Sequence, residues 1–167
     1  MDYMQIRDAQ EKDIRSILEI INFEILNTTA LYHYEPRTLN QQLEWFKDKK
    51  KSNFPVLVAE DESGIIGFGS YGTFRPWAAY QFSVEHSIYV HKDSQGKGVG
   101  KVLMSELIKR AKQEGYHTML AGVDASNEAS VAFHKKFGFK EVGIFKQVGY
   151  KFDKWLDLNF LQLLLKE

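Results

Sequence analysis

Three glycines at alternate positions, in the run 95–101, constrain the fold of this chain more than any other feature. The run follows a stretch of alternating apolar and polar residues at 84–90, which predicts a strand, and it opens a stretch at 98–114 with apolar residues at helical spacing. Glycines leave backbone N–H groups unobstructed, and the first turn of a helix has N–H groups without partners. With Lys97 and Lys101 beside them, these groups predict a turn that binds phosphate or pyrophosphate. The alternative is a turn whose glycines serve tightness alone.

The rest of the chain shows the same two periodicities. Strands are predicted at 4–7, 56–60, 65–72, 84–90 and 118–123, with two more in 141–165, and helices at 14–27, from Thr38 to Lys51, at 98–114 and at 127–137. No repeat, low-complexity tract or linker interrupts this order. The pattern predicts a single α+β domain over residues 1–167.

The composition excludes several classes of protein. The 22 basic residues balance the 22 acidic ones, which argues against nucleic acid as a partner, because phosphate backbones need a cationic excess. The absence of cysteine excludes thiol nucleophiles, cysteine zinc sites and disulfides, and it favours the cytoplasm. His86 and His91 lack a third ligand, so no metal is expected. The start of the chain lacks the apolar run of a signal peptide, and 156–165 is too short to span a bilayer.

The glycine-rich run carries a family resemblance. Gln95-Gly96-Lys97-Gly98-Val99-Gly100 fits the Gln/Arg-x-x-Gly-x-Gly/Ala signature of the GNAT superfamily of N-acetyltransferases, and the chain resembles this family over nearly its whole length. Four further blocks resemble its phosphinothricin acetyltransferase branch: Val84-Glu85-His86-Ser87-Ile88-Tyr89-Val90, Asn127-Glu128-Ala129-Ser130, 133–139 and Lys154-Trp155-Leu156-Asp157.

The resemblance implies a mixed, mostly antiparallel sheet of about seven strands flanked by about four helices. It also implies direct transfer of an acetyl group from acetyl-CoA to the α-amino group of a small acceptor such as phosphinothricin, methionine sulfone or methionine sulfoximine. A homodimer and a role in antibiotic or herbicide resistance are further implications. The alternatives are acetylation of a protein N-terminus or an aminoglycoside, and an acyl-CoA-binding regulator without catalysis.

The resemblance assigns site residues by matching positions. Glu85 is the expected general base, acting either directly or through water, and His134 is the expected general acid, with a tyrosine or water as the alternative proton source. The expected contacts of acetyl-CoA are Ile88, Tyr89, Val90, Gln95, Gly96, Lys97, Gly98, Val99, Gly100, Lys101, Asn127 and Lys136, of which Asn127 could instead cap a helix and Lys136 could be a solvated lysine. The acceptor contacts are expected from the residues themselves, because the segment 74–80 precedes the Glu85 strand and combines aromatic side chains with one arginine, and the irregular segment 29–38 could close the other side of a pocket. They are Arg75, Trp77, Ala78, Ala79, Tyr80, Glu85 and Tyr34, with core packing of the aromatic residues and a structural ion pair of Arg75 as the alternative.

Overall fold

The computed structural model describes residues 4–166, in which seven strands form one sheet in the order β1-β2-β3-β4-β5-β7-β6. The strands are β1 (Gln5–Asp8), β2 (Val56–Asp61), β3 (Gly64–Thr73), β4 (Ser83–Val90), β5 (Thr118–Asp124), β6 (Lys140–Lys151) and β7 (Lys154–Leu164). The α-helices are α1 (Ile14–Asn27), α2 (Leu39–Lys51), α3 (Val99–Gln113) and α4 (Glu128–Lys136), and short 3₁₀ turns are η1 (Glu11–Asp13), η2 (Ala78–Tyr80) and η3 (Lys92–Ser94). The predicted order and fold class are confirmed. The prediction of one domain over 1–167 includes residues 1–3 and 167, which lie outside the described residues.

The helices form where the sequence combines a buried apolar stripe with suitable ends. In α1, Ile14, Ile17, Ile21 and Ile25 recur at intervals of three and four residues and are at most 3% exposed. Each such side chain contributes about 2 kcal/mol by leaving water. The helix α2 starts at a capping box, in which the side chains of Thr38 and Gln41 each accept a hydrogen bond from the other's backbone N–H.

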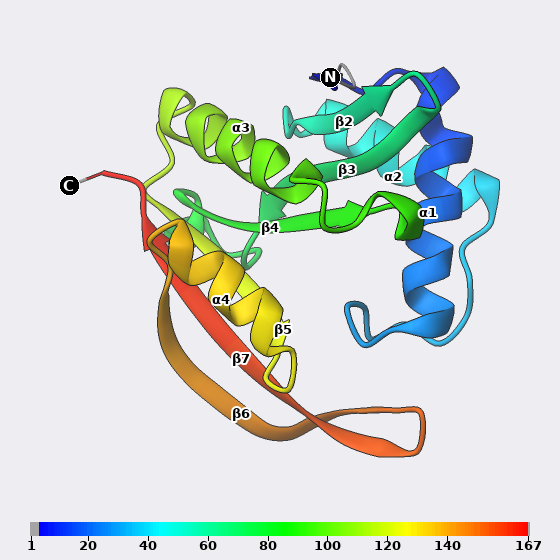
Figure 1. Ribbon diagram of the computed structural model, residues 1–167. Coiled ribbons are helices and arrows are strands. Elements are labelled where there is room, and N and C mark those ends of the chain that lie inside the picture. The colour runs from blue at the N-terminus through cyan, green and yellow to red at the C-terminus, as the bar shows by residue number, and fades with distance from the viewer. Residues whose placement is uncertain (1–3, 167) are drawn as a thin grey trace.

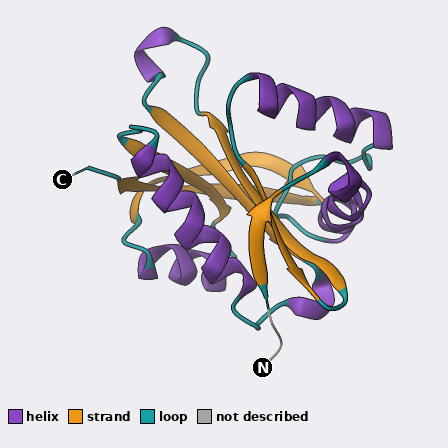
Figure 2. Ribbon diagram, turned by 90° about the horizontal axis from the view of Figure 1, so that it is seen from above, coloured by secondary structure: helices purple, strands orange, loops and turns teal. Residues whose placement is uncertain are grey.

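Helices cover both faces of the sheet (Figures 1 and 2). The helices α1 and α2 pack with Val56, Val58 and Phe68 in one core, and α3 packs with Leu57 and Ala59 in the other. Neighbouring residues of β2 thus point into opposite cores, as the pleat of a strand requires. In β4 the residue pattern predicts one apolar and one polar face, but Tyr89 of the second face contacts the α1 core. That expectation is wrong at this end of the strand because both of its faces are covered: Ile88 and Val90 pack with the α3 core, and Tyr89 packs with the α1 core.

The only parallel pair in the described sheet is β4 with β5, and it is short. Its register joins Ser83 to Thr118, Val84 to Met119 and Glu85 to Leu120, and no pairing follows. The next residues of β4 still pair with β3, through to Val90. Beyond Glu85 the two strands therefore diverge, as Figure 1 shows, and one edge of β4 is left without a strand partner.

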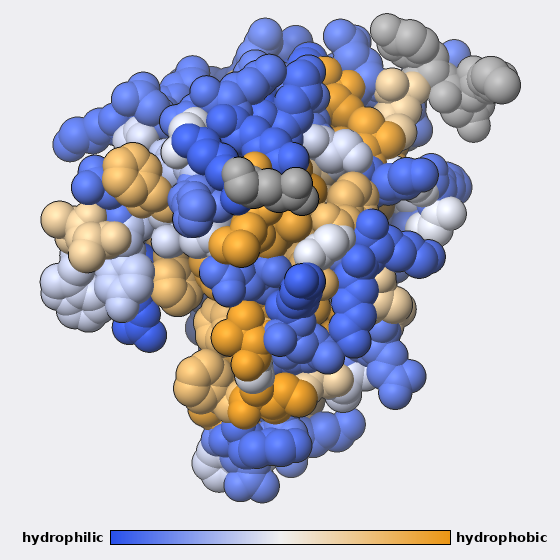
Figure 3. Space-filling view, turned by 90° about the vertical axis from the view of Figure 1, so that its left-hand side faces the viewer, coloured by the Kyte–Doolittle hydropathy of each residue, from blue (hydrophilic) through white to orange (hydrophobic). Residues whose placement is uncertain are grey.

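The strands β6 and β7 form a long hairpin at the edge of the sheet. Their connection consists of Phe152 and Asp153, which have φ angles of 52° and 59°. Two consecutive positive φ values are those of a tight two-residue hairpin turn. Most of β6 is exposed, including Val142 and Phe145, and Figure 3 shows apolar side chains over the lower part of the molecule, where this hairpin lies. None of the described helices is both long and apolar enough to cross a membrane.

Truncation of the fully buried Leu107 in α3 is expected to destabilise the fold strongly. Leu107→Ala should lower the free energy of unfolding by about 2–5 kcal/mol, because it leaves a cavity between α3 and the sheet. Val102→Ala on the exposed side of the same helix is the matched control and should change it by less than about 0.5 kcal/mol. Urea denaturation measures both, and equal losses would contradict the placement of α3.

Candidate active site

The glycine-rich turn forms the N-terminal end of α3. Gly96 and Gly98 have φ angles of 76° and 85°, a region that side chains rarely adopt. The carbonyl of Gly98 accepts the first helical hydrogen bond, from Val102 at 3.2 Å. The N–H groups of the intervening first turn therefore have no acceptor within the helix, and the helix dipole favours an anion there. Lys97 and Lys101 are exposed beside this turn.

The other residues of the turn differ in how they can contribute. Gln95 is exposed, whereas Val99 is 2% exposed and packs in the α3 core, so that only its backbone faces outward. Gly100 lies close to α4, because a Cβ added there would be 3.7 Å from the ring of Phe133. Lys136 is exposed in the last turn of α4, at the helix end away from Asn127.

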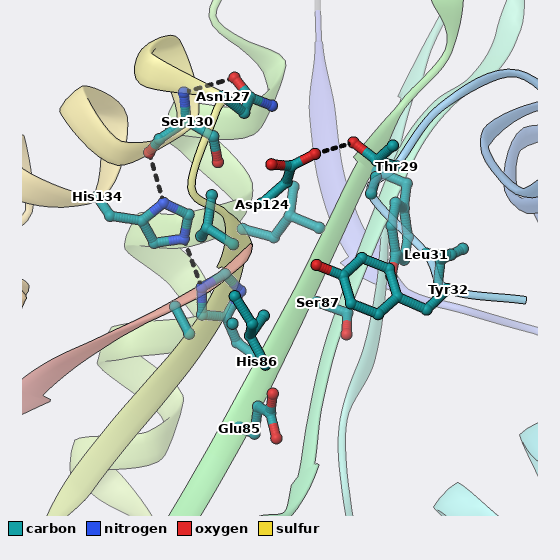
Figure 4. Close-up of a pocket in the computed structure, with 17 residues that line it drawn as sticks. Thr29, Leu31, Tyr32, Glu85, His86, Ser87, Asp124, Asn127, Ser130 and His134 are labelled. Atoms are coloured by element: carbon teal, nitrogen blue, oxygen red, sulfur yellow. Dashed lines mark hydrogen bonds between the residues drawn. The ribbon is translucent and has the colours of Figure 1, made fainter. Parts of the chain in front are cut away.

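A cavity of about 290 Å³ occupies the space where β4 and β5 diverge. Its walls come from five places in the chain, which Figure 4 shows together. They are residues 85–89 of β4, residues 121–124 of β5 with Leu158 of β7, Asn127, Ser130 and His134 of the α4 region, and residues 29–32 of the connection between α1 and α2. The structure thus brings together Glu85, His134, Asn127, Ile88 and Tyr89 of the predicted site. The Asn127 side chain caps α4 by accepting a hydrogen bond from the Ser130 N–H at 3.1 Å.

Glu85 is the acidic residue at the point of divergence. It is half-buried, and among residues 4–166 its carboxylate has neither a hydrogen bond nor an ion pair. Burial raises the pKa of Glu85, because a charged carboxylate loses hydration there. Gly122 makes room for it on β5, since a Cβ at that position would lie 3.3 Å from Glu85 Oε1. An unpaired carboxylate with a raised pKa is suited to accept a proton.

His134 lies in a buried pair with His86. Its Nε2 is 2.9 Å from His86 Nε2, and its Nδ1 is 2.7 Å from the carbonyl oxygen of Ser130 (Figure 4). Because a carbonyl only accepts, Nδ1 of His134 carries a proton. Burial lowers the pKa of both imidazoles, so both are neutral and His86 donates to His134 through its Nε2–H. Within the described chain, this leaves His86 Nδ1 as a buried atom without a partner.

The expected acceptor residues do not line the cavity of Glu85. Arg75 and Tyr80 line a second cavity of about 510 Å³, which is bordered mainly by apolar residues of β5, β6 and β7. Phe160 lines this second cavity and is also close to Gly122, beside Glu85. Trp77 is 62% exposed, and Ala78 and Ala79 are exposed in η2.

The connection between α1 and α2 lines the Glu85 cavity with residues other than the expected Tyr34. The hydroxyl group of Tyr34 donates to the carbonyl of Tyr150 and lies outside the cavity. Thr29 and Tyr32 line it instead, together with Asp124 of β5. The residues 28–38 show no regular periodicity, so no local signal could have separated Tyr32 from Tyr34.

Comparisons with known proteins agree with this geometry. The model of the Acetyltransferase (GNAT) family matches residues 17–139. An L-methionine sulfoximine/L-methionine sulfone acetyltransferase of Pseudomonas aeruginosa is 43% identical over 95% of this chain and 92% of its own length. A phosphinothricin N-acetyltransferase of Alcaligenes faecalis is 30% identical over 94% of this chain and 80% of its own length.

Solved structures share the whole fold. An N-acetyltransferase from Staphylococcus aureus superposes with a TM-score of 0.97 at 48% identity, covering 98% of this chain and 99% of the other. An acetyltransferase from Salmonella typhimurium, solved with its cofactor acetyl-CoA, has a TM-score of 0.95 at 40% identity and covers 98% of this chain and 95% of its own. From the family match, these identities and the shared fold, this chain belongs to the GNAT family of acetyltransferases.

Proposed function

We propose that the protein transfers an acetyl group from acetyl-CoA to the α-amino group of a small amino acid with a tetrahedral sulfur or phosphorus centre. The observation that carries this proposal is the unpaired, half-buried carboxylate of Glu85 at the divergence of β4 and β5. The names of the relatives from Pseudomonas aeruginosa and Alcaligenes faecalis supply the acceptor class.

The residues of the glycine-rich turn and of the cavity between β4 and β5 fit acetyl-CoA. When bound, acetyl-CoA supplies an activated acyl group as a thioester. The turn from Gln95 to Lys101, with its free N–H groups and two lysines, would hold the pyrophosphate. The cationic Lys136 is a further candidate contact of the pyrophosphate. The β4 edge at 88–90, which lacks a strand partner on the β5 side, would hold the pantetheine arm by its backbone.

Glu85 is the proposed general base. The acceptor enters as an ammonium ion, whose proton must leave before the nitrogen can attack. A carboxylate with a raised pKa accepts that proton more readily than an ordinary glutamate does. Glu85 lines the same cavity as residues 86–89 of β4 and residues 29–32, which supports the proposal that it acts between the donor and the acceptor.

Solvent water is the proposed proton source for the leaving thiolate. His134 was expected in this role from the resemblance, but both of its ring nitrogens are engaged, and it is 5% exposed and neutral. A neutral imidazole whose one N–H is bound to a carbonyl has no proton ready to donate. We therefore propose that His134 has a structural role, in which its hydrogen bond with His86 anchors α4 to β4.

Arg75 and Tyr80 remain candidates for the acceptor's carboxylate end. Their cavity adjoins the Glu85 site through Phe160. An acceptor with its amino group at Glu85 could therefore extend its carboxylate into the cavity of Arg75. A guanidinium group suits a carboxylate because of its paired N–H donors. Trp77, Ala78, Ala79 and Tyr34 line neither of the two cavities.

A homodimer in the cytoplasm is also part of the proposal. The face of β6 and its neighbours exposes many large apolar side chains, including Val142 and Trp155 at 63% each and Phe145 at 55%. A monomer rarely exposes so many large apolar side chains on two neighbouring strands. A second copy of the chain would cover them.

Turnover of amino-acid acceptors tests the proposed function. The protein with acetyl-CoA should release free CoA in the presence of methionine sulfone, methionine sulfoximine or phosphinothricin, because each presents a primary α-amine. A thiol-reactive dye measures the product. Failure with all three would overturn the acceptor class, and turnover with an aminoglycoside or an N-terminal peptide alone would replace it.

Replacement of Glu85 tests the base. Glu85→Gln should lower kcat by about 10²–10⁴-fold with little change in the KM for acetyl-CoA, because the amide keeps the shape and loses the proton acceptor. In the unmodified protein, kcat/KM should fall as the pH drops through the raised pKa of Glu85, and Glu85→Gln should lose this limb. Glu62→Gln, at an exposed turn, is the control. A kcat equal to that of the unmodified protein would remove Glu85 from this role.

Replacement of His134 distinguishes a structural from a catalytic role. His134→Phe should lower kcat by less than about tenfold while lowering the free energy of unfolding by about 1–3 kcal/mol, since it removes two buried hydrogen bonds. His86→Phe breaks the same bond from the other side and should behave alike. A loss of kcat of about 10²-fold or more in His134→Phe alone would restore His134 as the acid.

A further inference from the structure

Lys151, at the end of β6, is a buried lysine that the proposed reaction does not use. It is 4% exposed, and its Nζ donates to the carbonyl oxygens of Thr28 at 2.8 Å and Leu31 at 2.6 Å. Within residues 4–166 it forms no ion pair with a carboxylate. Burial of an ammonium group is unfavourable unless hydrogen bonds compensate it. The two carbonyl contacts therefore stabilise this charge, together with the ring of Phe152, whose centroid is 5.1 Å from Nζ. Both carbonyls belong to the connection between α1 and α2.

This connection has no helix or strand of its own over residues 28–38, and side-chain contacts fix it instead. The Thr29 hydroxyl donates to the carboxylate of Asp124, and the Tyr34 hydroxyl donates to the carbonyl of Tyr150. The ring of Tyr32 lies against Gly149, where an added Cβ would come within 2.6 Å of it. Three of these four attachments, including that of Lys151, lie on residues 149–151 of β6.

The attached segment is one wall of the Glu85 cavity. Thr29, Leu31 and Tyr32 all line it, and Figure 4 shows the Tyr32 hydroxyl directed toward its middle. No described residue forms a hydrogen bond with this hydroxyl. Burial raises the pKa of Tyr32, so the phenol stays protonated at neutral pH and has a hydrogen bond to donate.

We propose that Lys151 is a positioning residue for the acceptor: its ammonium group holds residues 28–31 so that Tyr32 presents its hydroxyl to an oxygen of the acceptor. The tetrahedral sulfur or phosphorus centre of the proposed acceptors carries such oxygens. This inference rests on the proposed function for the identity of the acceptor, but not for the role of Lys151 in holding the wall.

The kinetic test compares Lys151→Met with Lys154→Met. Methionine keeps an unbranched side chain and removes the charge and the donors, and Lys154 is an exposed lysine three residues away. Lys151→Met should raise the KM for the acceptor about tenfold, the loss expected for hydrogen bonds from a charged group, with kcat and the KM for acetyl-CoA changed by less than about threefold. Lys154→Met should match the unmodified protein. Lys151→Gln, which keeps one donor, should lie between them.

A merely structural role would give a different pattern. If Lys151→Met and Lys151→Gln lowered kcat in proportion to the loss of folded protein and left the acceptor KM unchanged, the proposal would be overturned. It would also be overturned if Lys151→Met kept the acceptor KM of the unmodified protein.

Amide hydrogen exchange tests the same proposal without an acceptor. Residues 29–32 should exchange faster in Lys151→Met than in Lys154→Met, while the amides of α3 stay equally protected. Equal exchange of 29–32 in the two variants would overturn the proposal even where the kinetic effect is seen. Faster exchange in a protein that acetylates none of the three amino acids would support the role of Lys151 and reject the proposed acceptors.

Discussion

The site depends on one interruption of the sheet, the end of β4–β5 pairing after Glu85 and Leu120. A parallel pair that continued would use the backbone groups of both strands, and no ligand could reach them. Because the strands diverge, β4 keeps a free edge within the sheet, and Glu85 lies at its inner end. The glycine-rich turn follows β4 after the short turn η3, so the same strand leads from the proposed base toward the proposed anion site.

Packing on both sides of the sheet keeps the strands apart. On one side, α3 and α4 share a core with β5 and β7, and the bond between His86 and His134 ties α4 to β4 across the gap. On the other side, the connection after α1 is fastened to β5 by Asp124 and to β6 by Lys151. The cavity is therefore enclosed by segments that the closely packed cores hold in fixed positions.

Local patterns predicted the order of the elements because helix and strand periodicities are properties of neighbouring residues. The proposed anion-binding turn could also be predicted from the sequence, because its glycines, its lysines and the start of its helix are contiguous. The divergence of β4 and β5 could not be predicted from the sequence, because it arises from packing between elements that are distant in the chain. The same holds for the His86–His134 pair and the Thr29–Asp124 bond, whose partners are 48 and 95 residues apart. Arg75 was placed beside Glu85 by its nearness in sequence, and the sheet assigns the two to different cavities.

A crystal structure of the complex with acetyl-CoA tests the central claim, that the gap between β4 and β5 is the donor site. The account predicts the pyrophosphate on the backbone N–H groups at the start of α3, with Lys97 and Lys101 beside it, and the pantetheine arm along β4 between His86 and Val90. It also predicts the thioester within reach of the Glu85 carboxylate. The account would be contradicted if acetyl-CoA bound instead in the cavity of Arg75 and Phe160 and the gap between β4 and β5 stayed empty.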